Sequence, residues 1–254
     1  MKEPLHVQLR AEGALPTLLA LPAVGLALVL AGWPLPCSGR GVTAPEAQRA
    51  AARRTVDEVA AALDRGAGAR VRAALEASGV PRSARRFWLV AIKDQRSLLL
   101  FGENASGARV PVRTWPVLAA SGTLGPKLQQ GDGQVPEGIY RIDRLNPNSA
   151  YHLSLGLDYP NAQDLARARR DGRTRLGGDI FIHGRDVSIG CLAIGDDAID
   201  ELFWLVASVG RRAFTVVIVP TDLRAAGVPQ AKGPPWVPEL YRELERELER
   251  FPAT

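Results

Sequence analysis

The chain has 254 residues, two cysteines, three histidines and a formal net charge of +5 at pH 7. This length exceeds what one modest core needs but falls short of two full domains once a leader is subtracted, so we expect one domain with terminal additions. The basic balance suits an anionic polymer or a membrane surface as a neighbour. Because the arginines are scattered and not interleaved with aromatic residues, nucleic acid is not expected as a partner.

Residues 1–39 have the pattern of an export leader. No charged residue occurs between Gly13 and Gly39, and the apolar run inside this stretch has the length of a secretion signal. We therefore expect an exported protein of the periplasm or cell envelope, with cleavage between positions 31 and 39. Two alternatives stay open: the run is also long enough to remain as an inner-membrane anchor, and Cys37 is a candidate for lipid attachment. Membrane contact is expected only through this segment.

Residues 40–82 are predicted to form a helical spacer rich in alanine and arginine. Apolar residues recur at helical spacing between Val56 and Leu63, glycines at 66 and 68 interrupt the pattern, and Gly79-Val80-Pro81 ends it. The sequence assigns no activity to this segment, so a spacer from the membrane is the simplest hypothesis.

Residues 83–220 are predicted to form a mostly β domain. Short β-prone runs separated by polar turns begin near Phe87 and predict a β meander. The strands expected from these runs cover residues 87–92, 97–101, 110–117, 139–142, 151–155, 179–182 and 213–219.

Two further elements and one long loop complete the predicted domain. The stretch 121–138 holds too many glycines and prolines for regular structure, and long loops on a sheet often hold substrate. Apolar residues from Ile199 to Val206 recur on one helical face and predict an amphipathic helix after Gly195. Residues 221–254 are expected to form a C-terminal helical extension, because glutamates and arginines alternate around regularly spaced leucines.

The segment from Asp179 to Cys191 carries the strongest functional signal. A short apolar run ends at His183, Cys191 follows eight residues later, and two glycines would let the loop fold back. A neighbouring imidazolium or helix N-terminus lowers the pKa of a thiol and yields the thiolate, so the pattern is typical of a cysteine nucleophile. His183 would then act as general acid and base, and the amides of Gly190 and Cys191 would bind an oxyanion.

Other readings of these residues need weighing. Cys191 can be a buried structural cysteine, and His152 a strand residue satisfied by a local hydrogen bond. A zinc site of His152, His183 and Cys191 has suitable ligand types but no short paired-ligand spacing. The Gly131-Asp132-Gly133 loop lacks the further acidic ligands that calcium needs. We therefore expect neither a metal nor a cofactor.

The same motif residues resemble a known family. His183-Gly184 followed by Ser188-Ile189-Gly190-Cys191 resembles the catalytic motif of the L,D-transpeptidase (YkuD-type) family. Upstream blocks at 121–127, 131–133, 136–140 and 151–161 are similar to the YafK-type branch of that family. Ile189 stands where the broad family has a histidine, and Ala193 where many members have an arginine; the branch is similar in lacking both.

The resemblance implies a fold and a set of residue roles. It implies a mostly β domain with flanking helices (α+β), built as a YkuD-like β-sandwich or barrel. By resemblance, Cys191 is the nucleophile, His183 is the general acid and base, and the Gly184 carbonyl orients the imidazole. Gly190 and Ser188 would support the nucleophile. The arginine run from Arg167 to Arg175 is expected in a polar loop before the strand that ends at His183, either as a solvated face or with one or two arginines binding carboxylates. The substrate-binding candidates are Arg175, Tyr151 and His152.

The resemblance also implies the reaction class. Cys191 would form a thioester with a peptidoglycan stem peptide, and an amine or water would resolve it. Capture by an amine cross-links or attaches protein, whereas capture by water trims the wall or releases a wall-linked lipoprotein. The sequence does not choose between them. A non-catalytic peptidoglycan-binding module of the same fold, favoured by Ile189, and a secreted cysteine peptidase acting on ordinary protein are the alternatives.

Overall fold

The computed structural model describes residues 53–227 and 233–252. The predicted leader, with Cys37, and the first part of the predicted spacer lie outside the described residues. Within the described ranges, every helix is too short or too polar to cross a bilayer.

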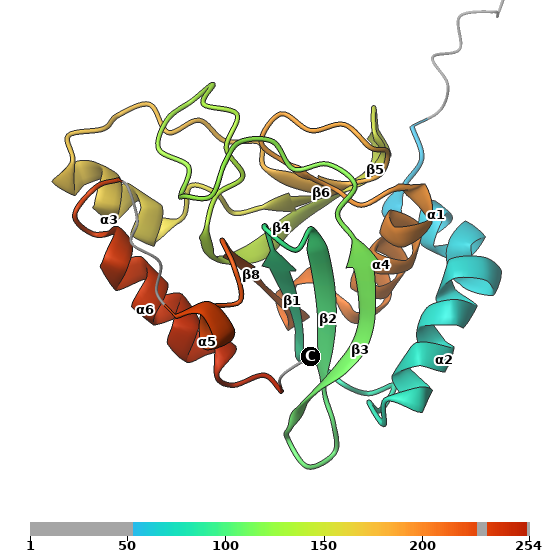
Figure 1. Cartoon of the computed structure of the whole chain (residues 1–254). Helices are drawn as coiled ribbons and strands as arrows, with labels where there is room; N and C mark the ends of the chain where they lie inside the picture. The colour runs from blue at the N-terminus through green and yellow to red at the C-terminus, as the bar shows by residue number, and fades with distance from the viewer. Residues whose placement is uncertain (1–52, 228–232, 253–254) are drawn as a thin grey trace, which may run out of the picture. The chain divides into compact units, whose positions relative to one another are not determined.

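A mixed eight-stranded sheet forms the centre of the described residues (Figure 1), with strand order β3-β2-β1-β8-β4-β5-β6-β7. Strands β1, β2 and β3 form the predicted antiparallel meander. Strand β8 lies between β1, to which it is parallel, and β4, to which it is antiparallel. The strands are β1 Phe87–Ile92, β2 Ser97–Glu103, β3 Arg109–Pro116, β4 Gly138–Ser149, β5 His152–Leu157, β6 Phe181–His183, β7 Leu192–Ala193 and β8 Phe214–Val219.

The predicted fold class, mostly β with flanking helices, is confirmed, but the sheet is not a closed barrel. Its edge strands are β3 and β7. The segment after β3 meets β7 at a single bridge between Ala119 and Ala193, where the Leu118 amide also donates to the Ala193 carbonyl (2.8 Å). The two edges therefore approach each other beside Cys191 without forming a continuous ladder.

Helices cover both faces of the central strands (Figure 1). Along β1, Leu89 contributes to a core cluster with α4, and its neighbour Val90 contributes to a second cluster with α6, as strand alternation requires. The helices are α1 Val56–Leu63, α2 Ala69–Ala77, α3 Ala162–Arg170, α4 Asp196–Val209, α5 Leu223–Ala226 and α6 Val237–Leu248, with a π-helical turn η2 at Asp64–Gly68 and a 3-10 turn η3 at Arg211–Ala213.

Both segments that flank the predicted β domain contribute to its core. Thr55 begins α1 with a capping box to Glu58, and Val71 and Leu75 of α2 belong to the same apolar cluster as α4. At the other end, Tyr241 and Leu244 of α6 pack in the cluster that includes Val217 of β8. The described part of residues 40–82 is therefore packed against the β domain.

The first part of the arginine run before β6, with Arg167, Arg169 and Arg170, lies in helix α3, where the sequence predicted a polar loop. Asn161 caps α3 through a capping box with Asp164. Ala168 is the one buried residue of α3, so the helix has no apolar stripe by which periodicity could reveal it.

Candidate active site

Strand register places His183 and Cys191 on one face of the sheet edge. Strands β6 and β7 pair in parallel, with Ile182 opposite Leu192 and His183 opposite Ala193. Cys191 therefore stands beside Phe181, two residues from His183. Because side chains alternate along a strand, Cys191 and His183 share a face, whereas Ile182 and Leu192 are buried in the core on the other.

The His183 imidazole is held in one tautomer. Its Nδ1 lies 2.6 Å from the Gly184 carbonyl oxygen, which can only accept, so Nδ1 carries the proton and the neutral ring presents Nε2 as a base. The Tyr151 ring lies over the imidazole, with centroids 4.7 Å apart. Burial lowers the pKa of His183, and the Gly184 bond opposes this in part. The surroundings therefore favour the neutral ring.

The Cys191 thiol is partly buried directly before β7. Its sulfur lies 3.7 Å from the Asp179 carbonyl oxygen. Burial raises the pKa of the Cys191 thiol, the Asp179 charge raises it further, and the Phe181 amide and the Lys127 charge oppose them. The sequence suggested a lowered thiol pKa, but this surrounding favours the neutral thiol. The geometry therefore suits a neutral thiol and imidazole that exchange a proton during attack, rather than a resting ion pair.

A pair of serine hydroxyls holds the backbone just before the nucleophile. The Gly190 amide donates to Ser121 Oγ (2.5 Å), and the Cys191 amide donates to Ser188 Oγ (3.1 Å). Each serine hydroxyl also donates a hydrogen bond to a carbonyl oxygen, that of Ser121 to Gly133 (2.7 Å) and that of Ser188 to Cys191 (2.6 Å). The two amides that the sequence suggested as an oxyanion site are thus both engaged in this structure.

Two glycines of the motif are fixed by close packing and backbone conformation. A β carbon at position 184 would lie 2.5 Å from Asp196 Oδ1 and 2.9 Å from the Tyr151 carbonyl oxygen. Gly190 has a φ of 103°, which a side chain disfavours. Asp196 Oδ1 also accepts from the Arg185 amide (2.8 Å), which ties the loop after His183 to the start of α4.

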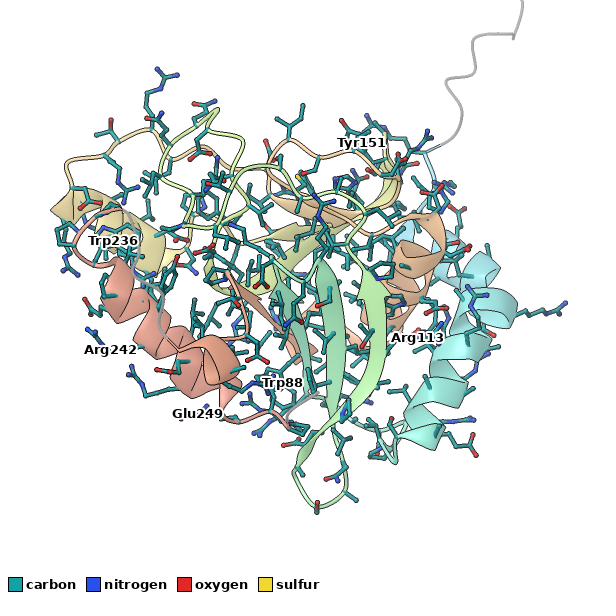
Figure 2. The ribbon with its side chains drawn as sticks, viewed as in Figure 1. Trp88, Arg113, Tyr151, Trp236, Arg242 and Glu249 are labelled. Carbon is teal, nitrogen blue, oxygen red and sulfur yellow. The ribbon has the colours of Figure 1, made fainter. Side chains whose placement is uncertain are left out.

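The remaining predicted site residues lie around this centre. Tyr151 is at the turn between β4 and β5 (Figure 2), where its ring covers His183. His152 Nε2 bonds to Asp200 Oδ1 of α4 (2.7 Å), so its ring anchors that turn. Arg175 is exposed and lines a surface groove with residues 129 and 130. The zinc alternative finds no support, since no metal-binding group of three or more such side chains occurs in the described ranges.

Sequence reasoning missed two contributions to the site. Ser121 belongs to one of the blocks that resemble the YafK-type branch, but that resemblance assigned it no role. The Asp179 carbonyl and the Phe181 amide are backbone groups, so the amino-acid type at these positions does not indicate their contact with the thiol.

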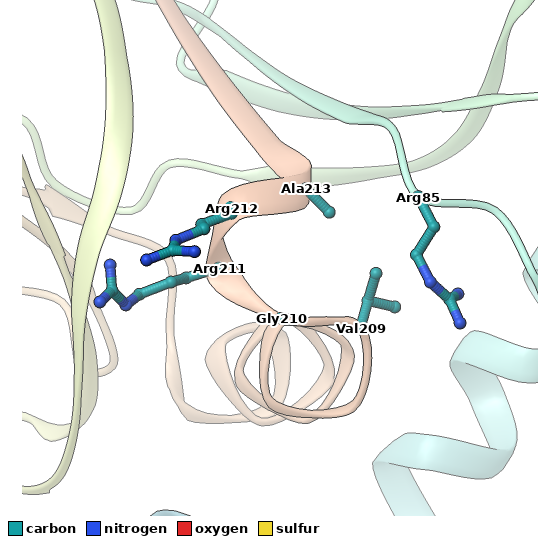
Figure 3. Close-up of a pocket in the computed structure, with 6 residues that line it drawn as sticks. All are labelled: Arg85, Val209, Gly210, Arg211, Arg212 and Ala213. Carbon is teal, nitrogen blue, oxygen red and sulfur yellow. The ribbon is translucent and has the colours of Figure 1, made fainter.

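A separate pocket lies well outside this constellation. It has a volume of about 510 Å³ and is lined by Arg85 and residues 209–213 (Figure 3). Figure 3 shows Arg211 and Arg212 on the opposite side of the turn from Arg85, so the three guanidinium groups do not converge. None of the predicted catalytic residues lines this pocket.

The chain is similar to known proteins over the β domain described above. The YkuD L,D-transpeptidase catalytic domain matches residues 85–219, which is more than half of the chain. The protein named "Putative L,D-transpeptidase YafK" from Escherichia coli (strain K12) is 32% identical over 150 residues, covering 57% of this chain and 58% of that protein. The chain thus matches little more than half of this relative's length.

Two solved structures resemble the described fold weakly. The helical cell shape determining protein Pgp2 from Campylobacter jejuni is 21% identical, with a TM-score of 0.44, covering 54% of this chain and 48% of Pgp2. L,D-transpeptidase 1 from Mycobacterium tuberculosis is 14% identical, with a TM-score of 0.31, covering 53% of this chain and 62% of that one. These scores are too low for a residue-level comparison.

Proposed function

Because this chain belongs to the L,D-transpeptidase catalytic-domain family, we propose that it is a cell-wall enzyme whose Cys191 forms a thioester with a peptidoglycan stem peptide. The observation that carries the proposal is the shared face of His183 and Cys191 on paired strands, with the imidazole Nδ1 fixed by the Gly184 carbonyl. A base and a thiol on the same face of adjacent segments support the proposal, because covalent catalysis by cysteine needs both.

The first half of the reaction forms the thioester. His183 Nε2 takes the thiol proton as the Cys191 sulfur attacks the peptide carbonyl carbon. The Cys191 amide can stabilise the resulting oxyanion by exchanging its 3.1 Å bond to Ser188 Oγ for one to the substrate oxygen. The C–N bond then breaks, and the imidazolium returns its proton to the departing amine.

The second half resolves the thioester. An amine or a water molecule loses a proton to neutral His183, attacks the thioester carbon and releases the Cys191 sulfur, which regains the proton. An amine acceptor gives L,D-transpeptidation, and water gives amidase or carboxypeptidase activity, including release of wall-linked lipoprotein. Both outcomes use the same two side chains, so the acceptor decides between them.

This activity is proposed for the periplasm or cell envelope. The charge-free apolar stretch between Gly13 and Gly39 supports export, and peptidoglycan stem peptides lie in that compartment. We propose contact with the membrane only through the N-terminal segment, whether that segment is cleaved or retained as an anchor.

A carbapenem provides the test, because it acylates a thiol nucleophile of this kind. Full-length protein and the Cys191→Ala variant are incubated with the drug, and intact mass is measured. We expect one adduct on the wild type and none on the variant. The same proteins are then incubated with purified muropeptides, whose products distinguish cross-linking, trimming and lipoprotein release.

The competing hypothesis is a peptidoglycan-binding module without turnover. Ile189, which is 87% exposed beside the nucleophile and replaces the histidine of the broader motif, favours this alternative. A wild type that binds muropeptides yet acquires no carbapenem adduct and forms no product would support the module and overturn the enzyme. Cleavage of casein, but not muropeptides, would instead indicate an ordinary cysteine peptidase.

A further inference from the structure

A polar groove lies between the loop that holds residues 129 and 130 and the loop that holds residues 172–175. Its walls are joined by two hydrogen bonds, from the Gln130 amide to the Arg175 carbonyl (2.8 Å) and from Arg173 Nη1 to the Leu128 carbonyl (2.8 Å). The groove has a volume of about 470 Å³. Its lining residues are Gln129, Gln130, Gly172, Arg173, Thr174 and Arg175.

One cationic side chain in this groove is not neutralised by the protein. Arg173 forms an ion pair with Asp171 (2.8 Å), and its guanidinium lies over the ring of Trp236. Trp236 lies near α3 at the start of α6 (Figure 2). In the described ranges Arg175 forms no ion pair, and its side chain is exposed.

The carboxylates nearby are already occupied. Asp132 pairs with Lys127 from the same loop, and Asp179 pairs with Arg144 (2.8 Å). The charge of Arg175 is therefore available to an external anion.

The groove is within reach of a peptide held at Cys191. Arg175 is four residues before Asp179, whose carbonyl oxygen is 3.7 Å from the sulfur, so even a fully extended chain would span only about 14 Å between their α carbons. In the loop that also carries Gln129 and Gln130, the Gln134 carbonyl oxygen would lie 3.2 Å from a β carbon on Gly190. Each of the two loops that line the groove therefore also contacts the segment around Cys191.

We propose that this groove binds a carboxylate of the acyl-donor peptide, with the Arg175 guanidinium as its partner and the side-chain amides of Gln129 and Gln130 beside it. A guanidinium presents two parallel N–H donors that match a carboxylate, which an ammonium group does not. The identity of the donor as a stem peptide rests on the proposed function. The anion preference rests on the groove alone.

Binding is tested without turnover, in the full chain carrying Cys191→Ala. Calorimetry compares a synthetic stem tetrapeptide with free carboxylates against the same peptide with each carboxylate converted to a carboxamide. We expect the free acid to bind roughly tenfold more tightly. Adding Arg175→Gln should remove this preference, whereas Arg175→Lys should keep part of it. Arg169→Gln, at an exposed arginine of α3, is the matched control and should retain the full preference.

Equal affinity for the acid and the carboxamide, or a preference that survives Arg175→Gln, would overturn the proposal. Failure of the proposed function gives a different result, because it would remove the carbapenem adduct and the muropeptide products of the wild type. Steady-state kinetics distinguish a role in substrate binding from a role in positioning the reacting groups. If Arg175 only binds substrate, Arg175→Gln should raise KM for the free acid and leave kcat and the alkylation of Cys191 by iodoacetamide unchanged.

Discussion

The central strands of the sheet and the edge that carries His183 and Cys191 are stabilised in different ways. Every residue of β1 is buried, and its side chains enter apolar clusters on both faces. Strands β6 and β7 have only three and two residues, and the backbone around them is held by side-chain hydrogen bonds from Ser121, Ser188 and Asp196. Apolar burial thus sets the stability of the sheet, whereas individual polar bonds set the geometry of its edge.

The buried carboxylate of Glu137 connects the central strands to the loop that reaches the edge. Glu137 is 1% exposed and accepts from Lys93 (2.9 Å), from the Gly125 amide (2.8 Å) and from Tyr241 of α6 (2.7 Å). It therefore fixes the loop that carries Ser121 to the strands and to the C-terminal helix. Because the centre depends on apolar burial and the edge on single polar bonds, we expect substitutions at the edge to change activity and leave the fold intact. Substitutions in the centre should lower stability and leave the activity of the folded protein unchanged.

Replacement of His183 at the catalytic edge should have the largest effect. His183→Ala should slow carbapenem acylation of Cys191 about 10³-fold, because a general base contributes on this order. Alkylation by iodoacetamide well above the thiol pKa should stay near the wild-type rate, since the thiolate then forms without the imidazole. Intact-mass time courses measure both. A variant that loses alkylation as well would show that His183 supports the loop rather than moving a proton.

A cavity in the central strands should reverse the pattern. Leu89 is fully buried in β1, so Leu89→Ala should lower the free energy of unfolding by about 3 to 4 kcal/mol, measured by urea denaturation. At a temperature where the variant is folded, its acylation rate per thiol should equal that of the wild type. A slower rate would mean that the centre and the edge are not separable.

Asp164 of α3 should make the stability of the fold depend on pH. Burial raises the pKa of Asp164 to about 6, partly opposed by the bond from the Asn161 amide. The folded state therefore binds a proton that the unfolded state lacks between about pH 4 and 6, and stability falls as pH rises through this window, by about 3 kcal/mol at most. Asp164→Asn should lack this component in denaturation curves collected from pH 4.5 to 7.5. Parallel curves for the two proteins would contradict the assignment.

Sequence patterns predicted the centre of this fold better than its edge. The runs beginning at Phe87, Ser97 and Phe214 are long and apolar, so their strands could be located within a few residues. Strand β7 has two residues, and α3 buries only Ala168, so neither leaves a periodic signal. The sequence singled out His183 and Cys191 because histidine and cysteine are rare in this chain.

The surroundings of the two catalytic candidates could not be predicted from residue types. Burial raises the pKa of the Cys191 thiol, and that burial depends on tertiary packing. Ser121 reaches Gly190 from 69 positions away in the sequence, a contact that no local pattern encodes.

Ser121 gives the smallest predicted effect and the sharpest comparison of edge with centre. Ser121→Ala leaves the Gly190 amide without its 2.5 Å acceptor, and Gly190 has no side chain to restrain the peptide plane before Cys191. We expect carbapenem acylation to slow about tenfold, which is about 1.4 kcal/mol, because oxyanion stabilisation depends on a fixed backbone.

Alkylation by iodoacetamide forms no oxyanion, so Ser121→Ala should leave its rate unchanged. Ser121→Thr keeps the hydroxyl and should restore acylation. Ser106→Ala removes an exposed hydroxyl that bonds to Asn104 in the β2–β3 turn, and it should match the wild type in both reactions. If acylation and alkylation slow together in Ser121→Ala, the serine acts on the sulfur itself. The hydrogen bonds of the edge would then not separate the reactivity of the sulfur from stabilisation of the oxyanion.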